Sequence, residues 1–593
     1  MSSIPIRYTI CPTHPAAHRF TVSCTVTTPD PAGQRFALPA WIPGSYLIRD
    51  FARHIVAIDA EAGGKNVRLE KLDKHTWRAA PVKKGLALTV RCEIHAWDLS
   101  VRGAHLDETH AFFNGTSVFL RVLGQESSPC LVDLQRPEGK SFAAWRVATA
   151  LPLASGEKHC ARRHGFGLYR AGDYDELIDH PVEMGCFTLI TFEACGIPHE
   201  VAITGQHDCD PERLSADLKR VCEWQIRFFD KPTQPAPVSR YVFLVTAVGD
   251  AYGGLEHRAS TSLLCARNDL PYPGMKDLPE SYRKFLGLCS HEYFHTWNVK
   301  RIKPAAFAPY DLDRENYTTQ LWVFEGITSY YDDLALLRSG VITLPDWLDL
   351  TAKTIANVMR APGRLRQSLA ESSFDAWSKF YRPDENTANA VVSYYAKGAL
   401  AALALDLTLR HGTRGRTSLD DVMRELWQRF GKTGIGIGDD DVQRIAEELS
   451  GLDLERFFAQ TIHGTRDIPL EKLFAPFGIR LAWEKAKTPA LGVKIGDEGH
   501  GVKLATVYDG GPAQQAGLSA GDTLIAIDDL RVTAKNLDTL LVRRKPGDTL
   551  TIHAFRRDEL MCFHLTLGAH DDDAPRLFCS KSSNALRHAW LEN

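Results

Sequence analysis

The pattern of hydrophobic residues changes twice along the chain of 593 residues, and these changes constrain the fold more than any other feature. Up to about residue 170, short segments such as 20–26 and 117–123 alternate apolar with polar residues or are rich in β-branched residues, which is typical of strands. Between about 280 and 460, apolar residues recur at the spacing of helices. Short strands return between about 488 and 568. We therefore expect a multidomain α+β protein.

The same changes divide the chain into four parts. We expect an N-terminal β-sandwich-like domain at 1–170, a mostly helical domain at 171–475 and a small module at 485–568. The remaining segment, 569–593, begins with acidic and polar residues, so we expect a loosely ordered C-terminal tail.

Charge and composition exclude several classes of function. A net charge of −3 provides no basic field for nucleic acid. No run approaches the ~20 apolar residues that span a bilayer, and the first residues lack the pattern of a signal peptide. The 13 cysteines are scattered without any CxxC pair, which indicates reduced thiols. We expect a cytoplasmic protein that binds neither nucleic acid nor membrane.

The strongest chemical signal is the motif His291-Glu292-Tyr293-Phe294-His295, in a stretch of helical periodicity. Two histidines four residues apart project from one face of a helix and can share a metal ion. Glu292, beside the first ligand, can take the proton of the attacking water. The pattern predicts one zinc ion per chain, with Glu292 as the general base, although solvated charges on a helix remain the alternative.

A catalytic zinc site needs a third protein ligand, and the candidates lie downstream. Asp311, Asp313 and Glu315 belong to a polar, loop-like stretch, whereas Glu325 is embedded in the apolar helical stretch LWVFEGITSYY. A carboxylate in apolar surroundings is costly unless it is paired or bound to metal. We therefore predict Glu325 as the third ligand, the alternative being a glutamate that faces solvent.

Three segments together carry a resemblance to a known family. HEYFHTWN at 291–298 and WVFEGITSYY at 322–331 resemble the gluzincin pattern, and they are distantly similar to the alanyl-type aminopeptidases. The longer spacing of 30 residues between His295 and Glu325, with WIPGSY at 41–46, resembles the glycyl aminopeptidase family. This resemblance implies a thermolysin-like catalytic domain at 171–475, a C-terminal PDZ domain and removal of small N-terminal residues, glycine or alanine.

The resemblance also implies substrate-binding residues ahead of the zinc motif. The segment Gly253-Gly254-Leu255-Glu256-His257 is similar to a Gly-x-Met-Glu-Asn segment of the alanyl-type enzymes, whose edge strand pairs with the substrate and whose glutamate binds the α-amine. Gly253, Gly254, Glu256 and His257 are therefore candidates for substrate binding, with His257 in place of the asparagine. A Gly-Gly turn followed by solvated charge is the alternative.

A tyrosine downstream of the zinc motif is similar to a catalytic group of the same enzymes. Tyr395 in Tyr-Ala-Lys-Gly matches a Tyr-x-Lys-Gly segment whose phenol donates to the oxyanion of the reaction. Tyr394 is the nearest rival, and core packing of both rings is the alternative.

The segment GGPAQQAGLSAGD at 510–522 resembles a PDZ domain. The resemblance places Leu491, Gly492 and Val493 at the loop that binds a peptide's C-terminal carboxylate, which implies capture of protein tails. Alternatively, the module packs on the catalytic domain and shapes its cleft or an oligomer contact, so a homo-oligomer is among the expectations.

The leading interpretation is a zinc aminopeptidase that acts on peptides with a free N-terminus. Two others remain: an endopeptidase that its PDZ module directs to protein tails, and a non-catalytic PDZ scaffold with a vestigial metal site.

Overall fold

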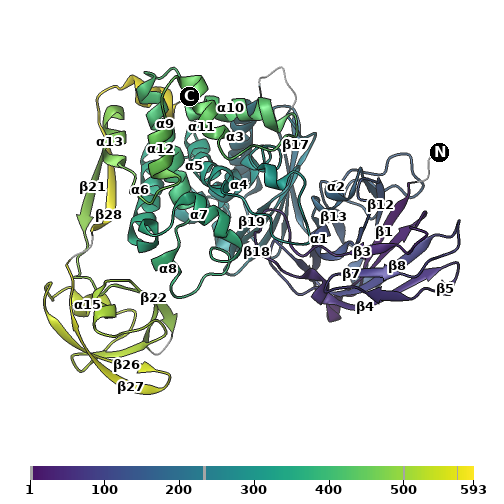
Figure 1. The fold of residues 1–593 in the computed structure, drawn as a ribbon, viewed down its shortest axis with the longest axis horizontal. Coiled ribbons are helices and arrows are strands. Elements are labelled where there is room, and N and C mark those ends of the chain that lie inside the picture. Colours follow the sequence, from purple (N-terminus) through teal and green to yellow (C-terminus); the bar gives the residue numbers. More distant parts are fainter. Residues whose placement is uncertain (1–3, 231–235, 499–500, 570–571, 593) are drawn as a thin grey trace. The chain divides into compact units, whose positions relative to one another are not determined.

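The computed structural model describes the chain except for residues 1–3, 231–235, 499–500, 570–571 and 593 (Figure 1). It separates into two compact units. The first comprises Met1–Asn316, Ser339–Val341 and Trp427–Ile437. The second comprises Tyr317–Arg338, Ile342–Leu426 and Gly438–Asn593.

The first unit begins with the predicted β region. Residues along β2 and β8 alternate between buried and less buried positions, so one face of their sheet is packed in the core. This sheet, largely purple in Figure 1, has seven strands in the order β14 (Gly167–Ala171), β12 (Cys130–Leu134), β1 (Ile6–His14), β2 (Arg19–Val26), β8 (Leu88–His95), β4 (Ile55–Ala62) and β5 (Lys65–Asn66).

One strand prediction in this region is wrong in part. The segment 117–123 forms the end of helix α1 (Gly115–Val118) and only a short strand, β11 (Arg121–Val122). Every residue of α1 is buried, and Gly115 packs so closely on the Ile178 backbone that an added Cβ would lie 2.8 Å from its Cα. Burial on all sides produces a continuous apolar run, which periodicity cannot distinguish from a strand.

Two further sheets of the first unit position the candidate site. One contains a hairpin and has the order β13 (Arg146–Ala148), β15 (Val182–Gly185), β10 (His110–Phe113) and β9 (Ala104–Leu106). The other has the order β16 (Thr188–Ala194), β17 (Ile197–Thr204), β18 (Tyr241–Val248), β20 (Ser260–Ala266) and β19 (Tyr252–Glu256). Strands β17, β18 and β20 run parallel, and β19 is antiparallel at the edge.

Two helices of the first unit cover this five-stranded sheet. Helix α3 (Pro211–Phe229) begins where the Asp210 side chain accepts from the Arg213 amide, with proline in the first turn. Gln225 of α3 donates to the backbone oxygen of Ser290 in helix α4 (Glu280–Phe294) at 2.9 Å. This bond links α3 to the last turn of α4, which carries the zinc motif.

The second unit contains most of the predicted helices. Helix α9 is buried almost throughout, and α6 begins at a capping box formed by Thr343 and Asp346. The main helices are α5 (Ile327–Arg338), α6 (Leu344–Arg360), α7 (Leu369–Phe374), α8 (Thr387–Ala390), α9 (Ala396–Gly412), α10 (Leu419–Leu426), α11 (Asp441–Ser450), α12 (Glu455–Thr461) and α13 (Leu470–Phe474).

The small C-terminal module forms its own sheet around its own hydrophobic core. The strands follow the order β22 (Val493–Glu498), β23 (Gly501–Val507), β24 (Thr523–Ile527), β26 (Thr549–Arg556) and β27 (Glu559–Thr566), and β25 (Leu530–Arg531) pairs with β24. Two short helices, α14 (Pro512–Gln515) and α15 (Leu537–Leu541), complete it.

The expectation of a loosely ordered tail is wrong for the described residues after the module. Strand β28 (Asp572–Cys579) pairs antiparallel with β21 (Ile479–Lys485), beside which it lies in Figure 1, and helix α16 (Ala585–Leu591) follows. Trp590 is fully buried and donates to the Tyr330 hydroxyl at 2.8 Å. The prediction from composition failed because the segment is mostly polar, whereas its order depends on the burial of Trp590.

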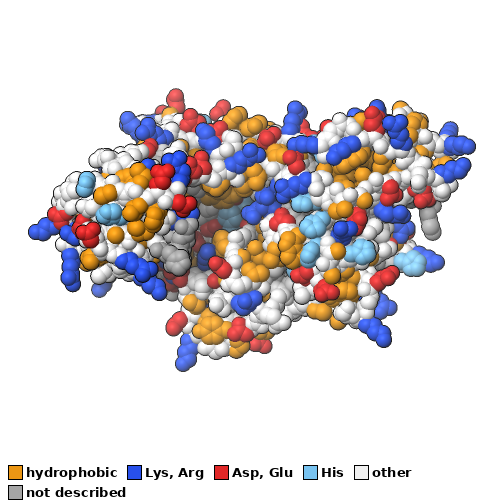
Figure 2. All heavy atoms as spheres, turned by 90° about the horizontal axis from the view of Figure 1, so that it is seen from below, with side chains coloured by type: hydrophobic (Ala, Val, Ile, Leu, Met, Phe, Trp, Pro, Cys, Tyr) orange, Lys and Arg blue, Asp and Glu red, His pale blue; other side chains and the backbone are white. Residues whose placement is uncertain are grey.

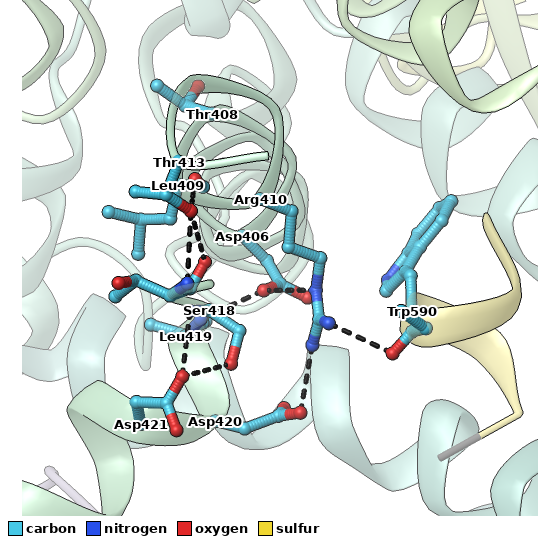
Figure 3. Close-up of polar contacts among 12 residues, drawn as sticks. Asp406, Thr408, Leu409, Arg410, Thr413, Ser418, Leu419, Asp420, Asp421 and Trp590 are labelled. Atoms are coloured by element: carbon cyan, nitrogen blue, oxygen red, sulfur yellow. Dashed lines mark hydrogen bonds and ion pairs between the residues drawn. The ribbon is translucent and has the colours of Figure 1, made fainter. Parts of the chain in front are cut away.

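A buried ionic cluster holds the end of the chain in place. Arg410 contacts Asp406 at 2.9 Å and Asp420 at 2.8 Å, and it donates to the backbone oxygen of Ala589 at 3.0 Å (Figure 3). Because both charges of each pair are matched and hydrogen-bonded, the cluster tolerates its burial.

The surface carries side chains of both charge signs, and the cysteines form no disulfides among the described residues. The face drawn in Figure 2 intersperses basic and acidic side chains. All 13 cysteines are free thiols. Within the described ranges, the helices are too short or too polar to cross a bilayer.

Candidate active site

The zinc motif lies at the C-terminal end of α4. His291 and Glu292 belong to its last turn, and His295 is the residue that follows the helix. The two imidazole rings have centroids 4.7 Å apart, as expected for histidines one turn apart. Nδ1 of His295 lies 2.7 Å from the Asn298 carbonyl oxygen. With the proton on Nδ1, the Nε2 lone pair is available for a metal ion.

The edge strand β19 passes directly over Glu292. A Cβ added to Gly254 would lie 2.0 Å from the Glu292 Oε1 atom, so only glycine fits there without moving one of them. At Gly253 an added Cβ would have its nearest neighbour, an Arg102 nitrogen, at 4.0 Å. The first unit therefore places the edge strand of its five-stranded sheet beside the predicted general base.

Glu256, at the end of β19, is 4% exposed. Its carboxylate packs against Gly44, where an added Cβ would lie 2.5 and 2.6 Å from the two carboxylate oxygens; Gly44 also has a positive φ of 96°. The ligand atoms of Glu256, Glu292 and His295 lie within 4.8 Å of one another, a His/Glu group that could hold a metal ion. Gly44 was missed as a site residue, although its motif WIPGSY was a signal.

His257 points into a buried charged cluster. Its Nδ1 lies 3.3 Å from Asp179 Oδ1, which also accepts from the Lys300 amine at 2.6 Å. Burial lowers the pKa of His257, against the opposing effect of Asp179. The Nδ1 contact of the His257 ring is therefore with Asp179 in the protein interior.

In the second unit, Glu325 lies in a π-helical turn, Trp322–Gly326, that leads into α5. It is 2% exposed, as the apolar sequence around it predicted. Gly326 crosses Gly398 of α9 so closely that a Cβ on Gly326 would lie 2.6 Å from the Gly398 Cα atom. This glycine contact brings the start of α5 against the start of α9.

Tyr395 immediately precedes α9. Its ring stacks on Phe380 with centroids 5.6 Å apart, and its hydroxyl lies 3.3 Å from that of Tyr381. Burial, followed by the negative charge of Glu325, holds the pKa of Tyr395 well above its usual value, so the phenol remains a proton donor at neutral pH. Tyr394 is fully buried and packs on Phe380.

The predicted carboxylate-binding loop lines a groove of the C-terminal module. Gly492 has a φ of 76°, and a Cβ there would lie 2.9 Å from Pro512, so the turn requires glycine. Strand β22, which follows the loop, is an edge strand. The groove is lined by Leu491, Gly492, Val493, Ile495, Leu537 and Leu541 of the module and by Ala356, Met359 and Arg360 of α6.

Comparison with family models matches three parts of the chain. Residues 7–186 match the Peptidase M61 N-terminal domain, residues 284–401 match M61 glycyl aminopeptidase, and residues 489–567 match a PDZ domain. Fold and motif thus define a metallopeptidase with a C-terminal PDZ domain. These matches confirm the expected fold class.

The particular family follows from these matches and from a solved structure. A crystal structure of an aminopeptidase N family protein from Idiomarina loihiensis is 42% identical, covers 99% of this chain and 100% of its own, and has a TM-score of 0.94. The chain belongs to the M61 glycyl aminopeptidase family.

An M1 zinc metallopeptidase from Deinococcus radiodurans is more distant, at 14% identity, with 78% of this chain and 94% of that chain covered and a TM-score of 0.49. No curated protein matches the chain.

Proposed function

We propose that the chain is a zinc-dependent aminopeptidase that removes N-terminal residues, preferentially glycine or alanine, from peptides. The observation that carries the proposal is the convergence of Glu256, Glu292 and His295 at the edge strand β19. A second carboxylate next to the general base suits the charged α-amine of a substrate, which an endopeptidase does not need to bind.

We propose that one zinc ion per chain is held by His291, His295 and Glu325. Two imidazoles and one carboxylate are a common ligand set of catalytic zinc, and His291, His295 and Glu325 supply these residue types. The hydrogen bond from His295 Nδ1 to the Asn298 carbonyl supports the assignment, because such bonds orient metal-binding histidines.

Each residue then has a distinct task. A zinc ion held there would lower the pKa of its water ligand to about 7 and would polarise the substrate carbonyl. Glu292 accepts a proton from the attacking water and passes it to the departing amine. Tyr395 donates a hydrogen bond to the oxygen on which negative charge develops. Glu256 holds the α-ammonium group, while β19, with Gly253 and Gly254, pairs with the substrate backbone.

The chemistry is tested by Glu292→Gln, with hydrolysis of glycine and alanine arylamides and zinc content as the measurements. Loss of a general base lowers kcat by about 10²–10⁴-fold. Zinc content should not change, and Glu280→Gln, at the exposed start of the same helix, should retain activity. Unchanged activity of Glu292→Gln would refute the mechanism.

Glu256→Gln tests whether cleavage is exopeptidic. An aminopeptidase should lose most of its activity and should not cleave N-acetylated peptides. If N-acetylated and free peptides were cleaved equally, the endopeptidase alternative would replace the proposal. Inactivity together with an absence of bound zinc would favour the scaffold alternative.

We also propose that the PDZ groove binds protein C-terminal tails, with the backbone amides at Leu491, Gly492 and Val493 receiving the carboxylate. The edge position of β22 supports this mode, because a peptide strand can pair at the edge of a sheet. Fluorescence polarisation should detect a peptide with a free C-terminus and not its amidated form. Equal binding of the two would rule out carboxylate capture.

A further inference from the structure

We propose that the hairpin of β9 and β10 carries a second divalent-cation site, formed by His105, Asp107 and His110. The ligand atoms of these three residues lie within 4.8 Å of one another. Both imidazoles are buried, with exposures of 4% and 6%. The site belongs to the N-terminal part of the chain and does not depend on the zinc motif or on the proposed peptidase function.

The hairpin turn fixes the carboxylate in a ligating position. Oδ1 of Asp107 accepts from the amides of Thr109 at 2.6 Å and His110 at 3.1 Å, which holds the side chain in the turn. Oδ2 lies 3.4 Å from Nε2 of His105. Two tetrahedral ligands, each about 2.0–2.1 Å from zinc, are about 3.3 Å apart, so this pair has the separation that a shared ion requires.

A buried carboxylate orients the second imidazole. Nδ1 of His110 lies 3.0 Å from Oε1 of Glu183, which also accepts from the Thr204 hydroxyl at 2.9 Å. Glu183 is 2% exposed, so this contact is not a fluctuating surface pair. With its proton on Nδ1, His110 presents the Nε2 lone pair to an ion, the arrangement found around many metal-binding histidines.

Unsatisfied polar atoms point to a missing occupant. A small cavity is lined by His105, His110 and Ser262, together with apolar residues of β10, β18 and β20. Within the described part of the chain, Nδ1 of His105 and the hydroxyl of Ser262 are buried without a hydrogen-bond partner. Buried polar atoms are normally paired, so a water molecule in this cavity would supply partners for Nδ1 and the hydroxyl, while Nε2 of His105 binds the ion.

The ligand chemistry favours zinc over magnesium or calcium. Two imidazoles and one carboxylate suit a borderline-soft cation, whereas magnesium and calcium take oxygen ligands. Three protein ligands leave one tetrahedral position, which water from the cavity can fill. Such an ion would stabilise the hairpin, because metal that binds only the folded state adds its binding free energy to stability.

The test is a zinc titration of the full-length, chelator-treated protein by calorimetry, with bound metal counted by mass spectrometry. We expect two equivalents for the wild type and one for His105→Ala, with hydrolysis of alanine arylamide by the zinc-loaded variant retained within twofold. The double variant His291→Ala/His295→Ala should keep the one equivalent of zinc that the hairpin binds. A failure of the proposed peptidase site can therefore be distinguished from a failure of the hairpin site.

Exposed histidines require a matched control, since several lie on the face shown in Figure 2. His95→Ala, an exposed histidine of β8, should keep both equivalents. If His105→Ala disturbs folding, Asp107→Asn serves instead. The amide oxygen of the new asparagine can still accept the hydrogen bonds of the turn, but it binds a metal ion less well than a carboxylate does. Equal zinc counts in the wild type and these site variants, or no equivalent in the His291/His295 variant, would overturn the proposal.

Discussion

The two histidine groups of the first unit are built on opposite principles. In the zinc motif, His291 lies in the last turn of α4, His295 directly follows it, and a local backbone oxygen at Asn298 orients the second ring. In the hairpin, His105 and His110 lie on adjacent strands, and the orienting group is Glu183, 73 residues further along the chain than His110. The helix site is local, whereas the hairpin site depends on tertiary structure.

This difference predicts which changes should affect each group. Substitutions that disturb α4 or its neighbour β19 should damage the peptidase and leave the hairpin intact. Substitutions around Glu183 should do the reverse. A substitution that affected the zinc motif and the hairpin group equally would contradict the claim that the two groups are independent.

The largest effect is expected from Gly254→Ala. The added methyl group would lie 2.0 Å from Glu292 Oε1, so the Glu292 carboxylate or the edge strand must move. Misplacing a general base costs about 10²–10⁴-fold in kcat/KM. Kinetics on alanine arylamide measure this loss, and the zinc count of the hairpin should stay constant.

Gly249→Ala, just before β19, provides the matched control, because its added methyl group has no neighbour closer than 3.9 Å. It should change activity less than threefold. If the two variants behaved alike, the close approach of β19 to Glu292 would be irrelevant to catalysis.

Next in size is Tyr395→Phe. The phenol remains protonated through burial and the charge of Glu325, so it is suited to donate to an oxyanion. Removing such a donor costs about 10²–10³-fold in kcat. Tyr394→Phe, which changes a ring in the core, should leave kcat nearly unchanged, and the opposite ranking would give the role to Tyr394.

The sequence revealed the features that depend on neighbouring residues and did not reveal those that depend on contacts between distant segments. The spacing of His291 and His295 is imposed by one helix turn, and the apolar neighbours of Glu325 reveal its burial, so both could be seen in the sequence. Gly44 could not be assigned, because its contact with Glu256 joins segments more than 200 residues apart. The order of the C-terminal segment was likewise hidden, since only two residues of α16, Trp590 and Leu591, are buried.

Acid should weaken the support of the zinc-motif helix. His199 lies 2.9 Å from the Tyr293 hydroxyl of α4, and burial lowers its pKa to about 4. Because the unfolded state binds a proton near pH 6.5, stability is complete above that pH and falls as the pH drops towards 4. At pH 5 the loss is about 2 kcal/mol, or ~30-fold.

Hydrogen exchange of peptides covering α4, compared between pH 7.5 and pH 5 after correction for intrinsic rates, measures this effect. His199→Gln should remove most of the pH dependence. His564→Gln, an exposed histidine of the PDZ domain, should not alter it. If the pH dependence persisted in His199→Gln, a titratable group other than His199 would be responsible for it.

The smallest effect sharpens the comparison most, because it acts only on the hairpin. Glu183→Gln keeps the size of the side chain and removes the negative charge that orients His110. Loss of such a partner lowers metal affinity about 10–100-fold. Zinc calorimetry should show this decrease in the hairpin equivalent alone, with arylamide hydrolysis unchanged. An unaltered hairpin affinity would mean that tertiary orientation of His110 is unnecessary, and the hairpin would then be as local a motif as the helix.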